Sequence, residues 1–287
     1  MNIQWFPGHM KKTLEEMQKN IKNVDVILYV LDSRAVFSCL NPSIDEIANH
    51  KPIIYVLNKI DLANEAETKK WKQYFEDKNC FVICTNSATG NIKKEVISKI
   101  KSALAEKIAK NQQKGLNIIY RAMVVGVPNS GKSSLVNALL GKYRAITGDK
   151  PGVTKSKLWV KISDGIELLD TPGTLWPNLK NQITAENLAL VGCIKEQILD
   201  EEALCCILIS RLKQICPNKL KERYGLEELQ DSNYDVLCDI AKKRGNILKG
   251  GELDTSKTAK IVLDDFKKTR IGKISLDDKD KIFDEKK

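Results

Sequence analysis

Short, mainly apolar runs recur through the first two thirds of the chain, and polar stretches separate them. Runs rich in Val, Ile and aromatic residues and bounded by polar residues are typical of buried parallel strands. Such runs cover residues 24–31, 52–57, 81–85, 120–125, 156–162 and 166–169. Helices are expected between them at residues 42–49, 65–75, 91–113 and 132–140. Strands that alternate with helices predict an α/β fold with a mostly parallel sheet.

After Trp176 the apolar residues recur at helical spacing alone. The recurring positions are Leu188, Val191, Ile194 and Ile198, followed by Leu204, Leu208, Leu212 and Ile215. Further helices are expected at residues 235–243 and 255–268, and no run there is typical of a strand. The pattern predicts two domains: an α/β domain over residues 1–178 and a small all-α domain over residues 179–287, joined by a linker at 177–182.

Length, composition and charge narrow the class of protein. The 287 residues can hold two cores, and 42% hydrophobic with 29% charged content is typical of a soluble globular protein. Lys and Arg number 47 against 37 Asp and Glu, which gives a formal charge of +10. This excess favours an RNA, DNA or anionic-membrane partner. A basic proteome without any polyanion partner would give the same charge.

Neither a membrane span nor a disulfide framework is expected. No stretch approaches the roughly 18 apolar residues of a membrane span. The start MNIQWFPGHMKK has no apolar core and no cleavage site typical of a secretory signal. The eight cysteines include no CxxC pair, and several stand in apolar runs. We expect them to be reduced and structural.

A phosphate-binding loop is predicted at residues 126–133, where GVPNSGKS matches GxxxxGK[ST] between an expected strand and an expected helix. Glycines let backbone N–H groups converge on phosphates, and the helix N-terminus adds a positive dipole. We expect Lys132 to reach the β- and γ-phosphates and the Ser133 hydroxyl to ligate magnesium. The nucleotide-binding residues assigned here are Asn129, Ser130, Gly131, Lys132, Ser133 and Ser134.

A second phosphate-side motif, DTPG, occupies residues 170–173 at the end of an expected strand. Asp170 there can hold magnesium through water, and the Gly173 amide can sense a γ-phosphate. A tetrapeptide of this kind is also a common turn. Its position 38 residues after Lys132, behind a pair of strands, suits the second switch of a GTPase.

Two further loops indicate that the base is guanine. NKID at 58–61 follows one expected strand, and the Asp61 carboxylate can accept two hydrogen bonds from guanine N1 and N2. Adenine cannot supply that pair, and a site with unpaired buried groups rejects it. TNSATG at 85–90 follows the next strand and can support guanine O6 through its backbone. The base-binding residues assigned here are Asn58, Lys59, Ile60, Asp61, Asn86, Ser87 and Ala88, with the Lys59 stem along the purine face.

The order of these motifs is unusual, because the guanine motif precedes the phosphate loop. Binding requires only that the loops meet at the carboxyl ends of adjacent strands, where open α/β sheets bind ligands. A chain can be cut and rejoined if its old termini lie close together. We therefore predict a circularly permuted P-loop GTPase domain, joined through residues 91–113. The second switch then leads directly into the all-α part.

The same motifs carry a resemblance to a known family. They are WFPGHM at 5–10, NKID, TNSATG, GVPNSGKSSLVN from 126, KPGVTK at 150–155, DTPGTLWP at 170–177, KGGELD at 249–254 and DDFKKTRIGK at 264–273. With them, nearly the whole chain resembles the circularly permuted GTPases of the ribosome biogenesis GTPase A family (RbgA or YlqF). The resemblance implies hydrolysis of GTP to GDP and phosphate, with Mg²⁺, during late assembly of the large (50S) ribosomal subunit, which stimulates hydrolysis.

The resemblance also implies roles for single residues. Thr154 takes the first-switch position and would supply a second hydroxyl to magnesium. Asn129 matches the asparagine of potassium-stimulated GTPases and would contact K⁺, or is simply a turn-favouring residue. His9 matches the family's proposed catalytic histidine and would orient water beside Lys132 and Thr154, or contacts RNA, or makes a structural hydrogen bond. Thr174 replaces a larger aliphatic residue, and its role is open.

The resemblance implies a partner and a compartment as well. The basic groups at 242–244 and at Lys267, Lys268, Arg270 and Lys273 would contact rRNA, or form a solvated helix face. The expected partner is a precursor of the large ribosomal subunit, with no membrane and no DNA. A monomer in the bacterial cytoplasm is expected. Two alternatives remain at this point: a nucleotide-gated binding switch with negligible hydrolysis, and a GTPase tied to a membrane transporter.

Overall fold

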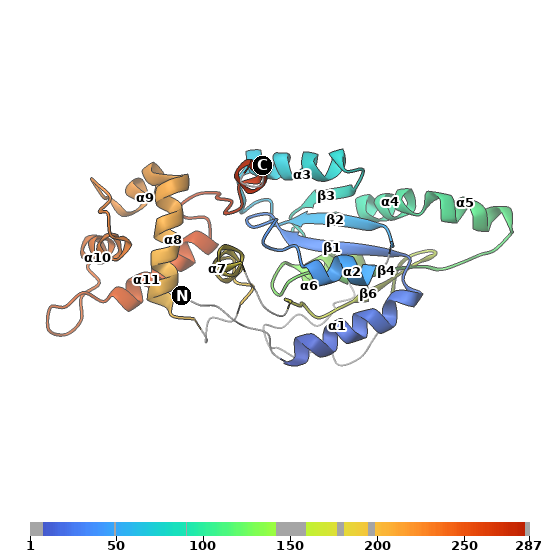
Figure 1. Ribbon diagram of the computed structural model, residues 1–287, viewed down its shortest axis with the longest axis horizontal. Helices are drawn as coiled ribbons and strands as arrows, with labels where there is room; N and C mark the ends of the chain where they lie inside the picture. Colours follow the sequence, from blue (N-terminus) through green and yellow to red (C-terminus); the bar gives the residue numbers. More distant parts are fainter. Residues whose placement is uncertain are drawn as a thin grey trace.

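The computed structural model describes residues 8–48, 50–89, 91–141, 159–176, 181–194 and 199–284, except for the side chains of His9 and Asp284. An α/β part lies at one end of the long axis and a helical part at the other (Figure 1). This arrangement confirms the predicted fold class: a mostly parallel sheet with helices, followed by an all-α region.

Six strands form the sheet in the order β3-β2-β1-β4-β6-β5. They are β1 (Val26–Asp32), β2 (Ile53–Asn58), β3 (Phe81–Thr85), β4 (Tyr120–Val125), β5 (Trp159–Ser163) and β6 (Ile166–Asp170). All neighbours pair parallel except β5 and β6, which are antiparallel. Every residue of β1 is buried, as expected of a central parallel strand covered on both faces. All six predicted strands are present, although residues 156–158 of the fifth prediction lie outside the described residues.

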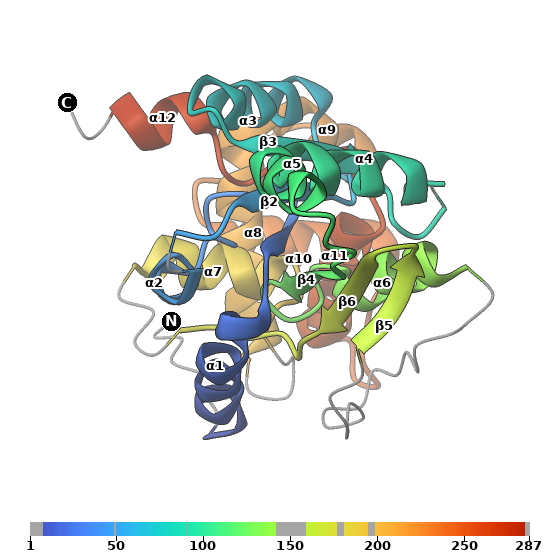
Figure 2. The ribbon, with the colours of Figure 1, turned by 90° about the vertical axis from the view of Figure 1, so that its right-hand side faces the viewer.

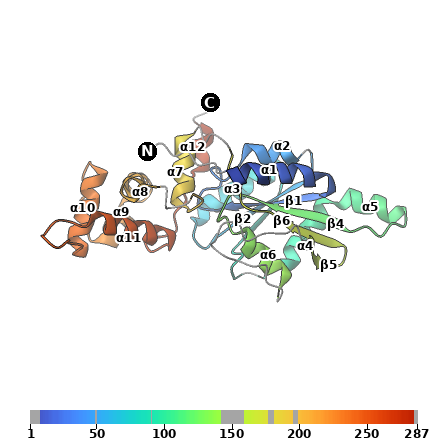
Figure 3. The same cartoon turned by 90° about the horizontal axis from the view of Figure 1, so that it is seen from below.

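Helices cover both faces of the sheet, because side chains alternate along each strand. Ile27, Tyr29 and Leu31 of β1 share a core with α1 (Gly8–Asn20), α2 (Pro42–Ala48) and α3 (Glu65–Asp77). The alternate β1 residues pack instead with α4 (Lys93–Ala103) and α6 (Lys132–Leu140). Figure 3 shows α1 and α2 on one side of the sheet and α6 on the other.

Two helical segments differ from the prediction. The single helix expected over 91–113 is two helices, α4 and α5 (Ala105–Gln113), which meet at Leu104. α5 buries none of its residues and projects from the α/β part (Figures 1 and 2). α1 was not predicted, although Met10, Leu14, Met17 and Ile21 recur at the spacing of one helical face.

The region after Trp176 is helical in the part that the structure describes. Its helices are α7 (Gln182–Leu190), α8 (Glu201–Ile215), α9 (Pro217–Tyr224), α10 (Asn233–Arg244) and α11 (Thr255–Lys267). Within this region, Ile247 and Leu253 form an isolated antiparallel β-bridge. The helical spacing predicted at Val191 and Ile194 is wrong, because α7 ends at Leu190 and the chain turns at Gly192 with a left-handed φ of 84°. Ile198, the next predicted position, lies outside the described residues.

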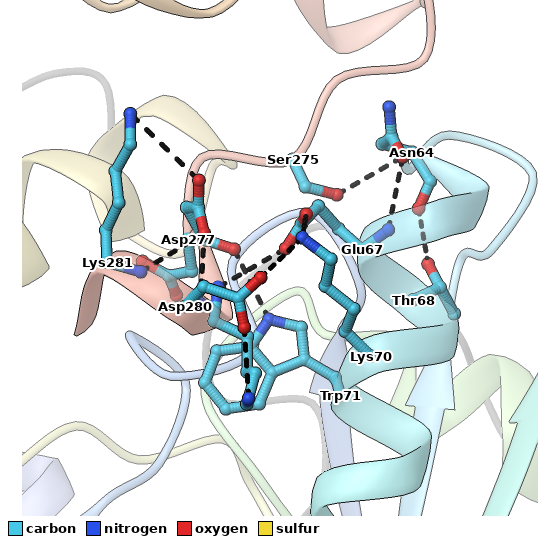
Figure 4. A network of polar contacts seen from close by, with 11 residues as sticks. Asn64, Glu67, Thr68, Lys70, Trp71, Ser275, Asp277, Asp280 and Lys281 are labelled. Atoms are coloured by element: carbon cyan, nitrogen blue, oxygen red, sulfur yellow. Dashed lines mark hydrogen bonds and ion pairs between the residues drawn. The ribbon is translucent and has the colours of Figure 1, made fainter. Parts of the chain in front are cut away.

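A C-terminal segment, residues 274–284, returns from the helical part to the α/β part. Its helix α12 (Lys279–Asp284) lies near α3, and Lys70 of α3 is paired with Asp280 at 2.7 Å (Figure 4). Asp277 accepts hydrogen bonds from the Ser38 main chain at 2.7 Å and the Asn187 amide at 2.8 Å. Burial raises the pKa of Asp277, although these donors partly oppose it.

The division into domains 1–178 and 179–287 stays a prediction. Residues 177–180 at its boundary lie outside the described residues. The C-terminal segment belongs to the second range by sequence but contacts the first: the indole N–H of Trp71 donates to the Asp277 carbonyl at 3.3 Å.

All eight cysteines are free. No group of three or more His, Cys, Asp or Glu side chains in this part of the chain could hold a metal ion. None of the described helices has both the length and the apolar character needed to cross a membrane.

Candidate functional site

Loops that are far apart in the sequence meet at the carboxyl edge of the sheet. Asn58, the last residue of β2, is 2% exposed and joins two of them. Its Nδ2 donates to the Ser130 carbonyl at 2.9 Å, and its Oδ1 accepts from the Ser87 N–H at 2.9 Å. One buried amide therefore holds the guanine motif, the phosphate loop and the TNSATG loop together.

The phosphate loop adopts a backbone that only glycine allows at two points. Gly131 has φ 98°, and a Cβ there would lie 2.0 Å from Nδ2 of Asn58. Gly126 has φ 150°, and its Cβ would lie 2.4 Å from the Val30 carbonyl oxygen. Both positions combine left-handed backbone with close approach, so a side chain would distort the loop. The loop leads into α6, whose free N–H groups favour an anion.

Lys132 is a buried cation at the start of α6. Its Nζ donates to the Val127 carbonyl at 2.8 Å, which folds the side chain back over the loop. Burial lowers the pKa of Lys132 to about 8, although Asp170 opposes this shift. A nearby phosphate would favour the charged form of this ammonium.

The DTPG segment lies directly on the phosphate loop. A Cβ on Gly173 would lie 2.6 Å from Nζ of Lys132 and 2.6 Å from Cα of Pro128. The Thr174 N–H donates to the Gly126 carbonyl at 3.2 Å. The Thr174 side chain is 1% exposed, and its hydroxyl has no partner among the described residues. The main chain of Thr174 therefore helps to hold the DTPG segment against the phosphate loop.

Two acidic side chains of the site contain buried oxygens that lack a hydrogen-bond partner in the described structure: Asp170 Oδ1 and Asp61 Oδ1. Burial raises the pKa of Asp170, and Lys132 partly lowers it. Leaving a buried acceptor unpaired is unfavourable by about 1–3 kcal/mol. A cation beside Asp170 and N–H donors beside Asp61 would satisfy these atoms, so the residues present fit a magnesium-bound guanine nucleotide.

Hydrogen bonds within the base-side loops, one between main-chain groups and one to a side chain, hold these loops in place. The Ile60 N–H donates to the Thr85 carbonyl at 3.4 Å, and the Ala88 N–H donates to Oδ1 of Asn86 at 3.0 Å. The Ser87 hydroxyl is buried without a partner among the described residues. The predicted base-binding residues are therefore brought together at one edge.

Asp32 and Arg34 are part of the site although the sequence did not point to them. The Lys59 ammonium lies 2.8 Å from Oδ2 of Asp32 and donates to the Asn129 carbonyl at 2.5 Å. Nε of Arg34 donates to Oδ1 of Asp32 at 2.9 Å. Burial alone would raise the pKa of Asp32, but Lys59 and Arg34 together lower it to about 2. The polar DSR at 32–34, directly after the strand predicted at 24–31, is the signal that could have identified them.

Asn129 connects the phosphate loop to the helical part. It is exposed, has φ 57°, and donates from Nδ2 to the Gly192 carbonyl at 2.7 Å. The Arg34 guanidinium donates to the neighbouring Val191 carbonyl at 3.2 Å. The turn after α7 is thus attached to the nucleotide-side loops at two points.

Other predicted residues are placed only in part. Ser133 is exposed and Ser134 is half-buried at the start of α6. Thr154 and the KPGVTK motif lie outside the described residues, as does the side chain of His9, whose backbone lies in the first turn of α1. The roles assigned to these residues stay predictions.

Proteins that are similar to this chain in sequence and in structure are GTPases, or are bound to a guanine nucleotide. The family described as 50S ribosome-binding GTPase matches residues 121–238. Ribosome biogenesis GTPase A of Bacillus cereus is 40% identical over 278 residues, which are 96% of this chain and 94% of that protein. The structure of GNP-bound YlqF from T. maritima has a TM-score of 0.66 and 27% identity, over 93% of this chain and 97% of the other. A GDP-bound structure of TM YlqF has a TM-score of 0.67 and 25% identity, over 92% of this chain and 99% of the other.

Proposed function

The chain belongs to the ribosome biogenesis GTPase A family and is a GTPase, and we propose that it acts in late assembly of the large (50S) ribosomal subunit, which stimulates its hydrolysis of GTP. The observation that carries the proposal is that Asn58 joins the guanine motif to the phosphate loop in a chain 40% identical to a protein named for ribosome biogenesis. Family membership also speaks against a switch with negligible hydrolysis.

Each loop has a proposed role in binding the nucleotide. Asp61 accepts from guanine N1 and N2, the 86–88 backbone supports O6, and the Lys59 stem covers the purine face. Lys132 neutralises the β- and γ-phosphates. The magnesium ligands proposed here are Ser133, Thr154 and, through water, Asp170, and the proposed K⁺ contact is Asn129.

Hydrolysis on this site depends chiefly on charge and positioning. The bound magnesium would neutralise charge that develops on the phosphate oxygens. Lys132 adds a second positive charge from within the loop, in a buried place where it is poorly screened. Gly173 lies against Lys132, and its proposed role is to sense the γ-phosphate through its N–H.

The proposed partner is a precursor of the large ribosomal subunit. The protein is proposed to bind it as a monomer, in the bacterial cytoplasm. The net charge of +10 supports contact with rRNA phosphates. α10 ends in Lys242, Lys243 and Arg244. The test is sedimentation with large subunits, in which a non-hydrolysable GTP analogue should retain the protein on the particle better than GDP does. Equal distribution with both nucleotides would contradict the proposal.

We predict that His9→Ala lowers subunit-stimulated turnover by about 10², the lower range for a positioned acid–base group. GTP affinity should stay within about twofold, because the proposed role of His9 concerns water and not the nucleotide. Phosphate release with and without subunits measures the effect. The matched control is His50→Asn, which changes the other histidine and tolerates its left-handed φ of 64°. Unchanged stimulated turnover in His9→Ala would remove His9 from the mechanism.

GDP affinity is predicted to fall as pH rises through 8. The pKa of Lys132 is lowered to about 8 in the free protein, whereas bound phosphates hold the ammonium charged. Binding above pH 8 therefore takes up a proton, and the dissociation constant should rise about tenfold between pH 7 and 9. Calorimetry at both pH values measures it. Lys132→Arg stays charged and should lose this dependence on pH. If the dissociation constant for GDP rises with pH equally in the two proteins, Lys132 is not the group that titrates.

A further inference from the structure

Asp32 occupies a constrained position beside the guanine motif. It is the last residue of β1, is 0% exposed, and pairs in register with Asn58 of β2. This pairing places its carboxylate next to Lys59, whose Nζ lies 2.8 Å from Oδ2. Lys59 itself has a left-handed φ of 59°. A charged residue at the end of a central strand thus contacts the lysine that is proposed to cover the base.

Arg34 fixes the orientation of the Asp32 carboxylate. Its Nε donates to Oδ1 at 2.9 Å and its Nη2 to Oδ2 at 2.8 Å, a two-point contact that prevents rotation. The guanidinium is in turn held from the helical part: it donates to the Val191 carbonyl and lies 5.9 Å from the ring centroid of Phe266. The carboxylate is therefore presented to Lys59 in one orientation.

We propose that Asp32 is a positioning residue for the guanine base. With the ammonium of Lys59 held by Asp32 Oδ2 at 2.8 Å and by the Asn129 carbonyl at 2.5 Å, the apolar stem spans from the guanine motif to the phosphate loop. The stem then forms one wall of the base pocket before the nucleotide arrives. Preorganisation of this kind reduces the side-chain entropy lost on binding. The inference rests on the proposed placement of guanine against Lys59.

The test is Asp32→Asn in the full chain, with GDP as the probe. Asparagine keeps the size of the side chain but loses the charge that holds Lys59. The dissociation constant for GDP, measured by calorimetry, should rise about tenfold, the size expected when a lysine must be ordered on binding. The turnover number at saturating GTP should stay within about twofold, because the pocket wall acts on ground state and transition state alike.

A double-mutant cycle shows whether Asp32 acts through Lys59. In a Lys59→Met background the ammonium is absent, so Asp32→Asn should not weaken GDP further. Asp25→Asn is the matched control: Asp25 stands just before the same strand, is paired with Lys107 and lies away from the loops. This control should leave GDP affinity unchanged.

Three results would overturn the proposal: unchanged GDP affinity in Asp32→Asn, an equal loss in the Lys59→Met background, or a parallel fall in turnover number. If Asp32→Asn lacks a cooperative thermal transition, Asp32→Glu takes its place. It keeps the charge and moves it by one methylene, so GDP should bind several-fold more weakly, and equal affinity would overturn the proposal. Absence of GDP binding by the unaltered chain would instead contradict the proposed function.

Discussion

Replacement of Asp61 by asparagine is expected to weaken GTP binding by about 10³ and to create affinity for xanthosine triphosphate. The Asp61 carboxylate has a buried oxygen without a partner in the described structure, and guanine offers two N–H donors to it. Hydrogen bonds to a charged group contribute about 1.5–3 kcal/mol each, so losing the pair gives this magnitude. The NH₂ group of an asparagine would face the N2 amino group of guanine, so that two donors meet. Xanthine has a carbonyl at this position, which can accept a hydrogen bond from the asparagine NH₂.

Calorimetry with GTP and xanthosine triphosphate on both proteins measures this exchange. The control is Asp77→Asn, a change of the same chemistry at the exposed end of α3, which should alter neither affinity. GTP affinity within about threefold of the unaltered protein would show that Asp61 does not contact the base. Loss of both nucleotides in a folded Asp61→Asn would indicate a structural role instead.

Replacement of Lys132 by methionine should lower the turnover number for GTP by about 10³. The ammonium is buried at the phosphate loop and lies beside Gly173. Removal of one such fixed charge from a poorly screened site typically lowers the turnover number by about 10²–10³. Methionine keeps an unbranched apolar stem, so the packing around α6 should survive.

Phosphate release at saturating GTP measures the effect on turnover apart from the loss of affinity that accompanies it. Lys94→Met changes an exposed lysine of α4 and should leave turnover unchanged. Thermal unfolding checks the fold, and the variant should be no less stable, because a buried ammonium is poorly solvated. A turnover number within about threefold of the original would exclude Lys132 from transition-state stabilisation.

The sheet and the meeting of the loops were predictable because each depends on local signals. Parallel strands buried on both faces read as continuous apolar runs, and β1 is buried along its whole length. The motifs at Asp61 and Lys132 each follow a strand, so parallel pairing alone brings them to one edge. The Asn58 contacts with Ser130 and Ser87 confirm that the loops meet.

Residues whose partners are distant in the sequence were not predictable. Arg34 contacts the Val191 carbonyl, 157 positions away, and the ring of Phe266. Nothing near residue 34 indicates those partners, so DSR reads as an ordinary polar turn. Contacts such as those of Arg34 arise from tertiary packing and leave little local pattern. The helix α1 was missed for a different reason: its apolar residues do recur at helical spacing, but they are few and stand among many charged ones.

The C-terminal segment has a consequence for synthesis of the protein. The Leu276 N–H donates to the Arg34 carbonyl at 2.7 Å, and the Ser275 hydroxyl accepts from the Asn64 N–H at 3.1 Å. These two hydrogen bonds reach Arg34, just after β1, and Asn64, just after the guanine motif. Both residues are translated more than 200 positions before Ser275 and Leu276. A nascent chain that has completed all its nucleotide motifs therefore still lacks these bonds. These contacts beside the pocket form only when Ser275 and Leu276 have left the ribosome that makes them.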